Sequence, residues 1–95
     1  MLKPVMNLLL FGMVLSTLTA TQKLTGVILD IQNYPIDYAM VQSVKTQTWV
    51  LSDENGFFIF PSNFSQGDSL VVSRIGFKTM INTPEKPNAI TIYLE

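Results

Sequence analysis

Acidic residues are the side chains of this chain best suited to chemistry, because its 95 residues include no histidine and no cysteine. Those two residue types supply the usual general base at neutral pH, the commonest metal ligand and the best thiol nucleophile. Asp53 and Glu54 could form a paired-carboxylate site, but adjacent residues at the end of a strand point in different directions. The sequence therefore predicts a protein that is not an enzyme and that uses no cofactor.

A calcium site is the second chemistry that acidic residues could supply, because Ca²⁺ prefers oxygen ligands from flexible loops. Turn capping explains the same residues more simply, since Asp and Asn side chains accept hydrogen bonds from backbone amides two residues on. We favour capping and predict no metal site. The residues considered as ligands are Asp30, Asp53, Glu54, Asn55 and Asp68, and those assigned as structural turn residues are Asp30, Pro35, Asp53, Gly56 and Gly76.

Aromatic residues offer a binding surface rather than a reactive group. Alternate residues of a strand face opposite sides, so if Phe58 and Phe60 fill the core, Phe57 and Ile59 lie outside. Exposed together, Trp49, Phe57 and Ile59 would form a docking surface. The alternative is that these side chains pack against a loop or a second sheet.

The elements that must carry these residues are short strands. Asp53-Glu54-Asn55-Gly56 has the composition of a turn and joins two apolar runs into a hairpin. Pro61 is expected to end the strand before it, because proline has no amide to donate, and residues 62–68 are expected to form an exposed loop with Phe64 as a peg into the core. The seven expected strands are Leu24–Asp30, Ala39–Val44, Thr48–Ser52, Phe57–Phe60, Leu70–Arg74, Phe77–Ile81 and Ala89–Leu94.

Strands at this spacing predict an all-β domain, a sandwich or a small barrel. We expect the pairing to be antiparallel, because no connection is long enough to hold a crossover helix.

Residues 1–20 have the layout of a secretory signal peptide. Lys3 is followed by an apolar run at Leu8–Leu15 and by small polar residues up to Ala20, where cleavage is expected. The apolar run is shorter than the roughly 20 residues that span a bilayer, so we expect no membrane span after cleavage. Residues 21–95 are then the folded domain.

Charge gives no sign of a nucleic-acid partner. After Ala20 the chain holds five basic and seven acidic residues, a net charge of −2, and the basic residues do not cluster. Non-specific nucleic-acid binding depends on a basic patch, so this class of partner is excluded.

Four blocks of the sequence, in order, resemble the carboxypeptidase-regulatory-like domain found in secreted and outer-membrane proteins of Bacteroidetes-type bacteria. The resemblance covers Leu24 to Leu94 and implies a seven-stranded Greek-key β-sandwich of the prealbumin-like (transthyretin-like) type. In the first turn Tyr34 follows Asn33 where the family usually has glycine, a change that could require a different turn type. The blocks are Leu24–Asp30, Pro35–Val41, Ser52–Phe58 and Gly67–Lys78.

Domains of this family are accessory modules, beside metallocarboxypeptidase catalytic domains or ahead of the plug and barrel of TonB-dependent receptors. The resemblance therefore implies a non-enzymatic accessory or protein-interaction module of the bacterial cell envelope, exported across the inner membrane and periplasmic or outer-membrane associated, with an envelope protein as its partner. It is expected to be either a stand-alone module or the front of a larger receptor. The alternative function is a secreted module that binds a small ligand or a glycan through its aromatic residues.

Overall fold

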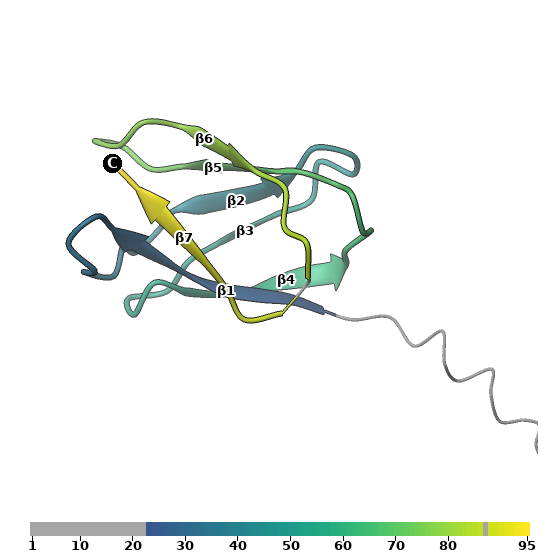
Figure 1. Ribbon diagram of the computed structural model, residues 1–95, viewed down its shortest axis with the longest axis horizontal. Coiled ribbons are helices and arrows are strands. Elements are labelled where there is room, and N and C mark those ends of the chain that lie inside the picture. Colours follow the sequence, from purple (N-terminus) through teal and green to yellow (C-terminus); the bar gives the residue numbers. More distant parts are fainter. Residues whose placement is uncertain (1–22, 87) are drawn as a thin grey trace, which may run out of the picture.

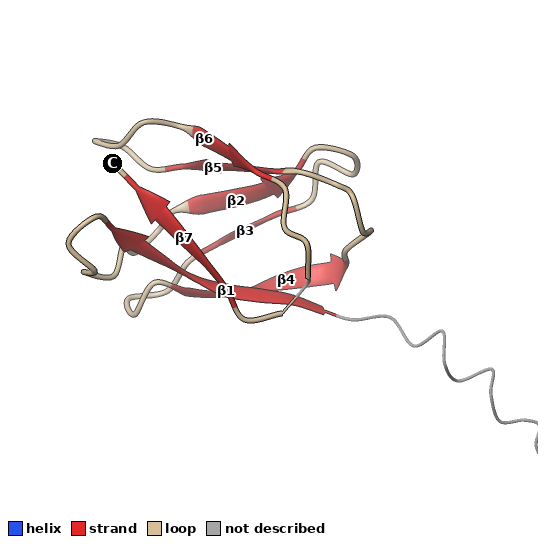
Figure 2. Ribbon diagram, viewed as in Figure 1, coloured by secondary structure: helices blue, strands red, loops and turns tan. Residues whose placement is uncertain are grey.

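A computed structural model describes residues 23–86 and 88–95, and every regular element in them is a β-strand (Figure 2). The expected all-β class and the seven strands are confirmed, whereas the predicted signal peptide lies outside the described residues. Strand ends differ from the expectation mostly by one or two residues, but the sixth strand begins only at Met80, because residues 74–77 form a turn. The strands are β1 (Lys23–Asp30), β2 (Met40–Ser43), β3 (Trp49–Leu51), β4 (Phe57–Asn63), β5 (Leu70–Ser73), β6 (Met80–Asn82) and β7 (Ile90–Leu94).

The strands form two sheets that lie as two layers (Figure 1). One sheet has the order β4-β1-β7 and the other has the order β3-β2-β5-β6. The expected hairpin at Asp53–Gly56 is therefore wrong, because the turn joins β3 and β4, which lie in different sheets and do not pair. The expectation of purely antiparallel pairing is wrong for β1 and β7, which are parallel from Gly26↔Ile90 to Asp30↔Leu94. A parallel pair needs a long connection, and here the strands of the second sheet supply it in place of a crossover helix.

Pro61 does not end β4, which continues to Asn63. The pairing of β4 with β1 shifts register between Thr25↔Ile59 and Lys23↔Asn63, so β4 has extra residues at Pro61. Because β4 is also an edge strand, its proline interrupts no ladder on the open side, and an edge or a bulge is where a sheet tolerates proline.

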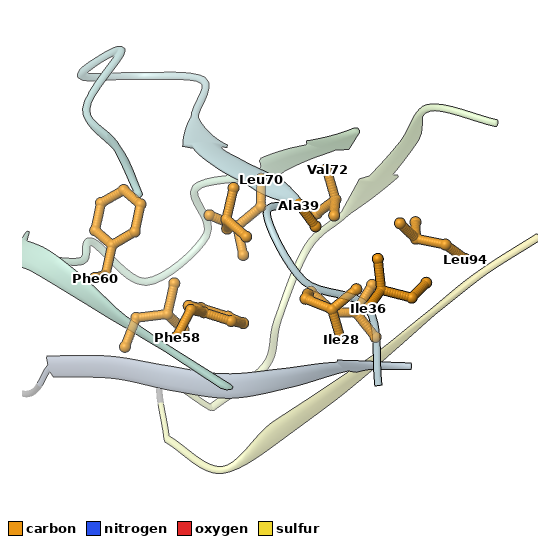
Figure 3. Close-up of a cluster of buried hydrophobic side chains, with 11 residues drawn as sticks. Ile28, Ile36, Ala39, Phe58, Phe60, Leu70, Val72 and Leu94 are labelled. Carbon is orange, nitrogen blue, oxygen red and sulfur yellow. The ribbon is translucent and has the colours of Figure 1, made fainter. Parts of the chain in front are cut away.

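One hydrophobic core lies between the sheets (Figure 3). It takes alternate residues from both layers, as the period of a strand requires. Phe64, expected as a peg, packs edge-on against Phe60 with ring centroids 6.1 Å apart and an interplanar angle of 81°. The buried apolar residues are Leu24, Ile28, Ile36, Ala39, Val41, Phe58, Phe60, Leu70, Val72, Ile92 and Leu94.

Gly26 allows β1 to approach β7 and β4 closely. A Cβ atom at this position would lie 2.7 Å from the Ile90 carbonyl oxygen and 2.9 Å from the Phe58 ring. Since real side chains do not come so close, only glycine fits this point of the sheet.

Candidate functional site

The outer side of the β4-β1-β7 sheet presents apolar side chains. On β4 the side chains of Phe57 and Ile59 are 43% and 50% exposed, whereas Phe58 and Phe60 are buried, as strand alternation predicts. The register places Val27 of β1 beside Phe57. We call this surface the three-strand face, and its residues are Thr25, Val27, Leu29, Phe57, Ile59, Thr91 and Tyr93.

The outer side of the β3-β2-β5-β6 sheet is also largely apolar. Its inner side chains include Val41 and Val72, which are buried, so the intervening residues face outward. Trp49 is 54% exposed and lies opposite Gln42 of β2. We call this surface the four-strand face, and its residues are Met40, Gln42, Trp49, Leu51, Val71, Ser73 and Ile81.

The structure does not bring the three residues of the predicted docking surface together. Phe57 and Ile59 lie on the three-strand face, and Trp49 lies on the four-strand face. The two faces point away from each other, because each sheet turns its other side to the shared core. All three side chains are exposed, but they belong to two separate surfaces.

Asp30 and Asp53 cap two turns of the same construction. The Asp30 Oδ1 atom accepts hydrogen bonds from the amides of Gln32 and Tyr34, at 2.8 and 3.0 Å. The Asp53 Oδ1 atom accepts hydrogen bonds from the amides of Asn55 and Phe57, both at 2.9 Å. Each aspartate amide also donates to the carbonyl four residues on, at 2.8 Å.

The fourth residue of each of these turns has a left-handed backbone. Asn33 has a φ of 73° and Gly56 a φ of 78°. Asparagine is one of the few residues that accept this conformation, so Asn33 takes the place that glycine holds in the second turn. Tyr34 comes directly after this left-handed residue, and its bulky side chain does not require a different turn type. The Asp30–Tyr34 turn is therefore built like the Asp53–Phe57 turn.

Pro35 and Gly76, the other two predicted turn residues, lie in different loops. Pro35 forms an isolated antiparallel bridge with Leu29 next to the end of β1. Gly76 has a φ of 93° and stands in the turn between β5 and β6, where the amide of Phe77 donates to the Arg74 carbonyl at 3.0 Å.

Sequence reasoning did not single out the loop around Tyr38. Tyr38 is 64% exposed and has a φ of 56°, a strained conformation for a bulky residue. The loop is held by Arg74, whose Nε donates to the Asp37 carbonyl at 2.6 Å and whose guanidinium pairs with the Asp37 carboxylate at 3.2 Å. A hollow of about 420 Å³ beside Tyr38 is also lined by Met40 and Ile75.

Buried Ser52 fixes the other side of that loop. Its hydroxyl donates to the Ile36 carbonyl at 2.7 Å and accepts from the Ala39 amide at 2.9 Å. The carbonyl of Ser52 accepts from the Tyr38 amide at 3.0 Å. The loop that contains the strained Tyr38 is thus held by hydrogen bonds from Arg74 on one side and from Ser52 on the other.

Asp68, which was expected in an exposed loop, is buried with only 3% of its surface exposed. It accepts hydrogen bonds from the Ser43 hydroxyl and from the amides of Ser69 and Lys45, at 2.7 and 3.2 Å for the amides. Burial alone would raise the pKa of Asp68, but the bond from Ser43, the two amides and the charge of Lys45 outweigh it and lower this pKa. The residue therefore ties the β2–β3 turn to the loop before β5.

The acidic residues considered as calcium ligands serve separate loops. Asp30, Asp53 and Asp68 each accept amide hydrogen bonds within their own loop. In the part of the chain that the structure describes, no three acidic, histidine or cysteine residues gather closely enough to hold a metal ion. No helix within the same residues is long and apolar enough to cross a membrane.

The chain was also compared with known proteins. It matches no protein-family model and none of the curated proteins.

Proposed function

We propose that the chain is a non-enzymatic protein-interaction module of the bacterial cell envelope, related to the carboxypeptidase-regulatory-like domains. The four sequence blocks and the leader-like residues 1–20 support this proposal. The strand order supports the finer assignment of a Greek-key, prealbumin-like β-sandwich. The neighbouring strands β1 and β4, and likewise β2 and β5, are joined by long connections that cross to the other sheet and return.

The observation that carries the proposal is the apolar three-strand face. Phe57, Ile59 and Tyr93 are 43 to 50% exposed there, and Val27 and Leu29 lie between them on β1. A contiguous apolar surface of this kind typically marks an interaction site. The proposed partner is an envelope protein, such as a TonB-dependent receptor or one of its subunits.

A non-enzymatic role fits the polar groups that the fold buries. Ser43, Ser52 and Asp68 are the buried polar side chains of the described residues, and each is bonded to loop backbone or to another member of this set. These bonds give each of the three a structural task. The acidic turn residues likewise cap backbone amides.

Capture of a partner from envelope extracts tests the proposal. The full chain is immobilised as the native protein and as the double variant Phe57→Thr/Ile59→Thr, which keeps strand-forming residues while removing the apolar surface. The matched control is Trp49→Thr on the four-strand face. We expect the native chain and the control to retain the same envelope protein and the double variant to lose it. Equal capture by all three, or capture by none, would contradict the proposal.

A second candidate function is the binding of a small ligand or glycan beside Tyr38. Its support is the hollow of about 420 Å³ next to the exposed, strained tyrosine, because strained residues gather at ligand sites. A glycan array with the native chain and with Tyr38→Ala tests it. A glycan hit that Tyr38→Ala removes supports this function, and an array without any hit removes it.

A further inference from the structure

The two sheets have four edge strands, and three of them carry features that hinder the addition of a further strand. β4 contains Pro61 and a shift of register. β3 and β6 have three residues each, and Pro84 follows β6. Proline, irregular pairing and short length are devices by which proteins protect sheet edges.

β7 is an edge strand without these devices. It pairs with β1 in continuous register over five residues and contains neither proline nor a charged residue. The Glu95 carbonyl accepts a hydrogen bond from the Lys78 amide at 2.8 Å, so the backbone groups of Glu95 point away from β1. Because backbone direction alternates along a strand, the amide and carbonyl groups of Thr91 and Tyr93 also point to the open edge.

A hollow of about 230 Å³ lies next to this edge, between the end of β7 and the start of β6. Half-buried Met80, which packs against the core, gives it apolar surface, and the buried Leu94 lies next to it. The side chains of Lys78 and Glu95 also line it and carry opposite charges. Its lining suits one apolar side chain.

A second copy of the chain fits this edge less well than a segment of another protein. A symmetric β7 pair would be limited to about five residues, because Ala89 leaves the extended conformation at a φ of 58° and the Glu95 carbonyl is occupied by Lys78. Such a contact has far fewer residues than the roughly 20 to 30 on each side of a stable protein–protein interface. A short peptide segment needs only main-chain hydrogen bonds and a side-chain pocket.

We propose that the partner protein binds by adding an extended, uncharged segment to β7. The segment becomes the fourth strand of the β4-β1-β7 sheet, hydrogen-bonds to the backbone of Thr91 and Tyr93, and places an apolar side chain in the hollow beside Leu94. The inference rests on the proposed docking function and specifies how the partner is held.

Peptides selected against the full chain from a display library of random sequences provide the probe. Thr91→Pro and Tyr93→Pro each remove one outward amide and leave the bonds to β1, and Trp49→Thr on the four-strand face is the control that leaves β7 unchanged. We expect each proline variant to weaken binding about tenfold, as loss of one hydrogen bond predicts, and the control to change it much less. Hydrogen exchange of the Thr91 and Tyr93 amides is expected to slow when the peptide binds.

N-methylation of alternate peptide amides tests the same pairing without altering the protein, so the result does not depend on whether a proline variant folds. We expect methylation at one set of alternate positions to abolish binding and at the other set to be tolerated. The inference is overturned if no peptide is enriched, if methylation at every position is tolerated, or if slowed exchange appears on other strands. A dimer of the chain alone that Thr91→Pro dissociates would replace the partner segment with a second copy.

The edge inference and the docking function can fail separately. If the captured envelope protein binds the proline variants as tightly as the native chain, the edge inference fails and the docking function stands. If no envelope protein is captured, the docking function itself fails.

Discussion

The matched turns at Asp30–Tyr34 and Asp53–Phe57 allow the cost of a side chain at Gly56 to be separated into two parts. A Cβ atom at Gly56 would lie 2.4 Å from the Ile28 carbonyl oxygen, and this oxygen belongs to backbone that cannot rotate away. The turn must therefore move and weaken the 2.7 Å bond from the Ile28 amide to the Gly56 carbonyl, which costs about 1 kcal/mol. The left-handed φ of 78° adds about 1 to 2 kcal/mol for alanine.

We therefore expect Gly56→Ala to lower the free energy of unfolding by about 2 to 3 kcal/mol. Gly56→Asn should be milder, because asparagine accepts the left-handed backbone and only the collision with Ile28 remains. At the equivalent position of the first turn, Asn33→Ala should cost about 1 to 2 kcal/mol, the backbone part alone. Asn33→Gly should change stability by less than about 0.5 kcal/mol, because glycine fits the turn but gains freedom in the unfolded chain.

Urea unfolding followed by Trp49 fluorescence and by circular dichroism measures these four free energies. From the most to the least destabilised, we expect the order Gly56→Ala, then Gly56→Asn and Asn33→Ala, then Asn33→Gly. If Gly56→Ala costs no more than Asn33→Ala, the collision with Ile28 has no energetic consequence and this explanation of Gly56 is wrong.

Two further predictions concern buried polar groups. The pKa of Asp68 is lowered in the folded state, so the stabilisation from its carboxylate is complete above the ordinary aspartate pKa of about 4 and is lost as the pH falls below that value. Between pH 5 and pH 2.5 the urea midpoint should therefore drop less in Asp68→Asn than in the native chain. Equal drops would contradict the contacts assigned to Asp68. Ser52→Ala leaves the buried Ile36 carbonyl and Ala39 amide without their partner and should cost about 2 to 3 kcal/mol in urea unfolding. The control Ser65→Ala, at an exposed serine, should cost less than about 0.5 kcal/mol. Similar values for the two variants would contradict the role of Ser52.

The strands could be predicted from the sequence because their alternation is a local property. Ile90, Ile92 and Leu94 alternate with Thr91 and Tyr93, and the structure turns Ile92 and Leu94 into the core. The same alternation correctly separated Phe58 and Phe60 from their outward neighbours. Local pattern therefore sufficed for seven strands and for the side that most of them bury.

Pairing between strands is not a local property, and the predictions that were wrong concern pairing. The direction of β7 relative to β1 depends on the path of the chain through the other sheet, which no short pattern records. Pro61 would end a central strand, but it is accommodated because β4 is an edge strand with a register shift. The separation of Trp49 from Phe57 has the same origin, because β3 and β4 are consecutive strands in different sheets.

Buried polar contacts were the least predictable part of the candidate site. Asp68 lies in a polar stretch that has the composition of an exposed loop, and its burial follows from Ser43, which is 25 residues earlier in the chain. Ser52 looks like an ordinary strand end, yet it holds Ile36 and Ala39 from the facing loop. The left-handed backbone of Tyr38 has no signal in its residue type, because tyrosine rarely adopts it.

We propose that the three-strand face and the adjoining β7 edge together form the partner-binding surface. Amide chemical-shift changes across the full chain, recorded as the captured envelope partner is added, locate that surface. We expect the largest changes on β4, β1 and β7, including the amides of Ile59, Thr91 and Tyr93. Changes confined to the four-strand face around Trp49, or to the loop around Tyr38, would contradict this proposal.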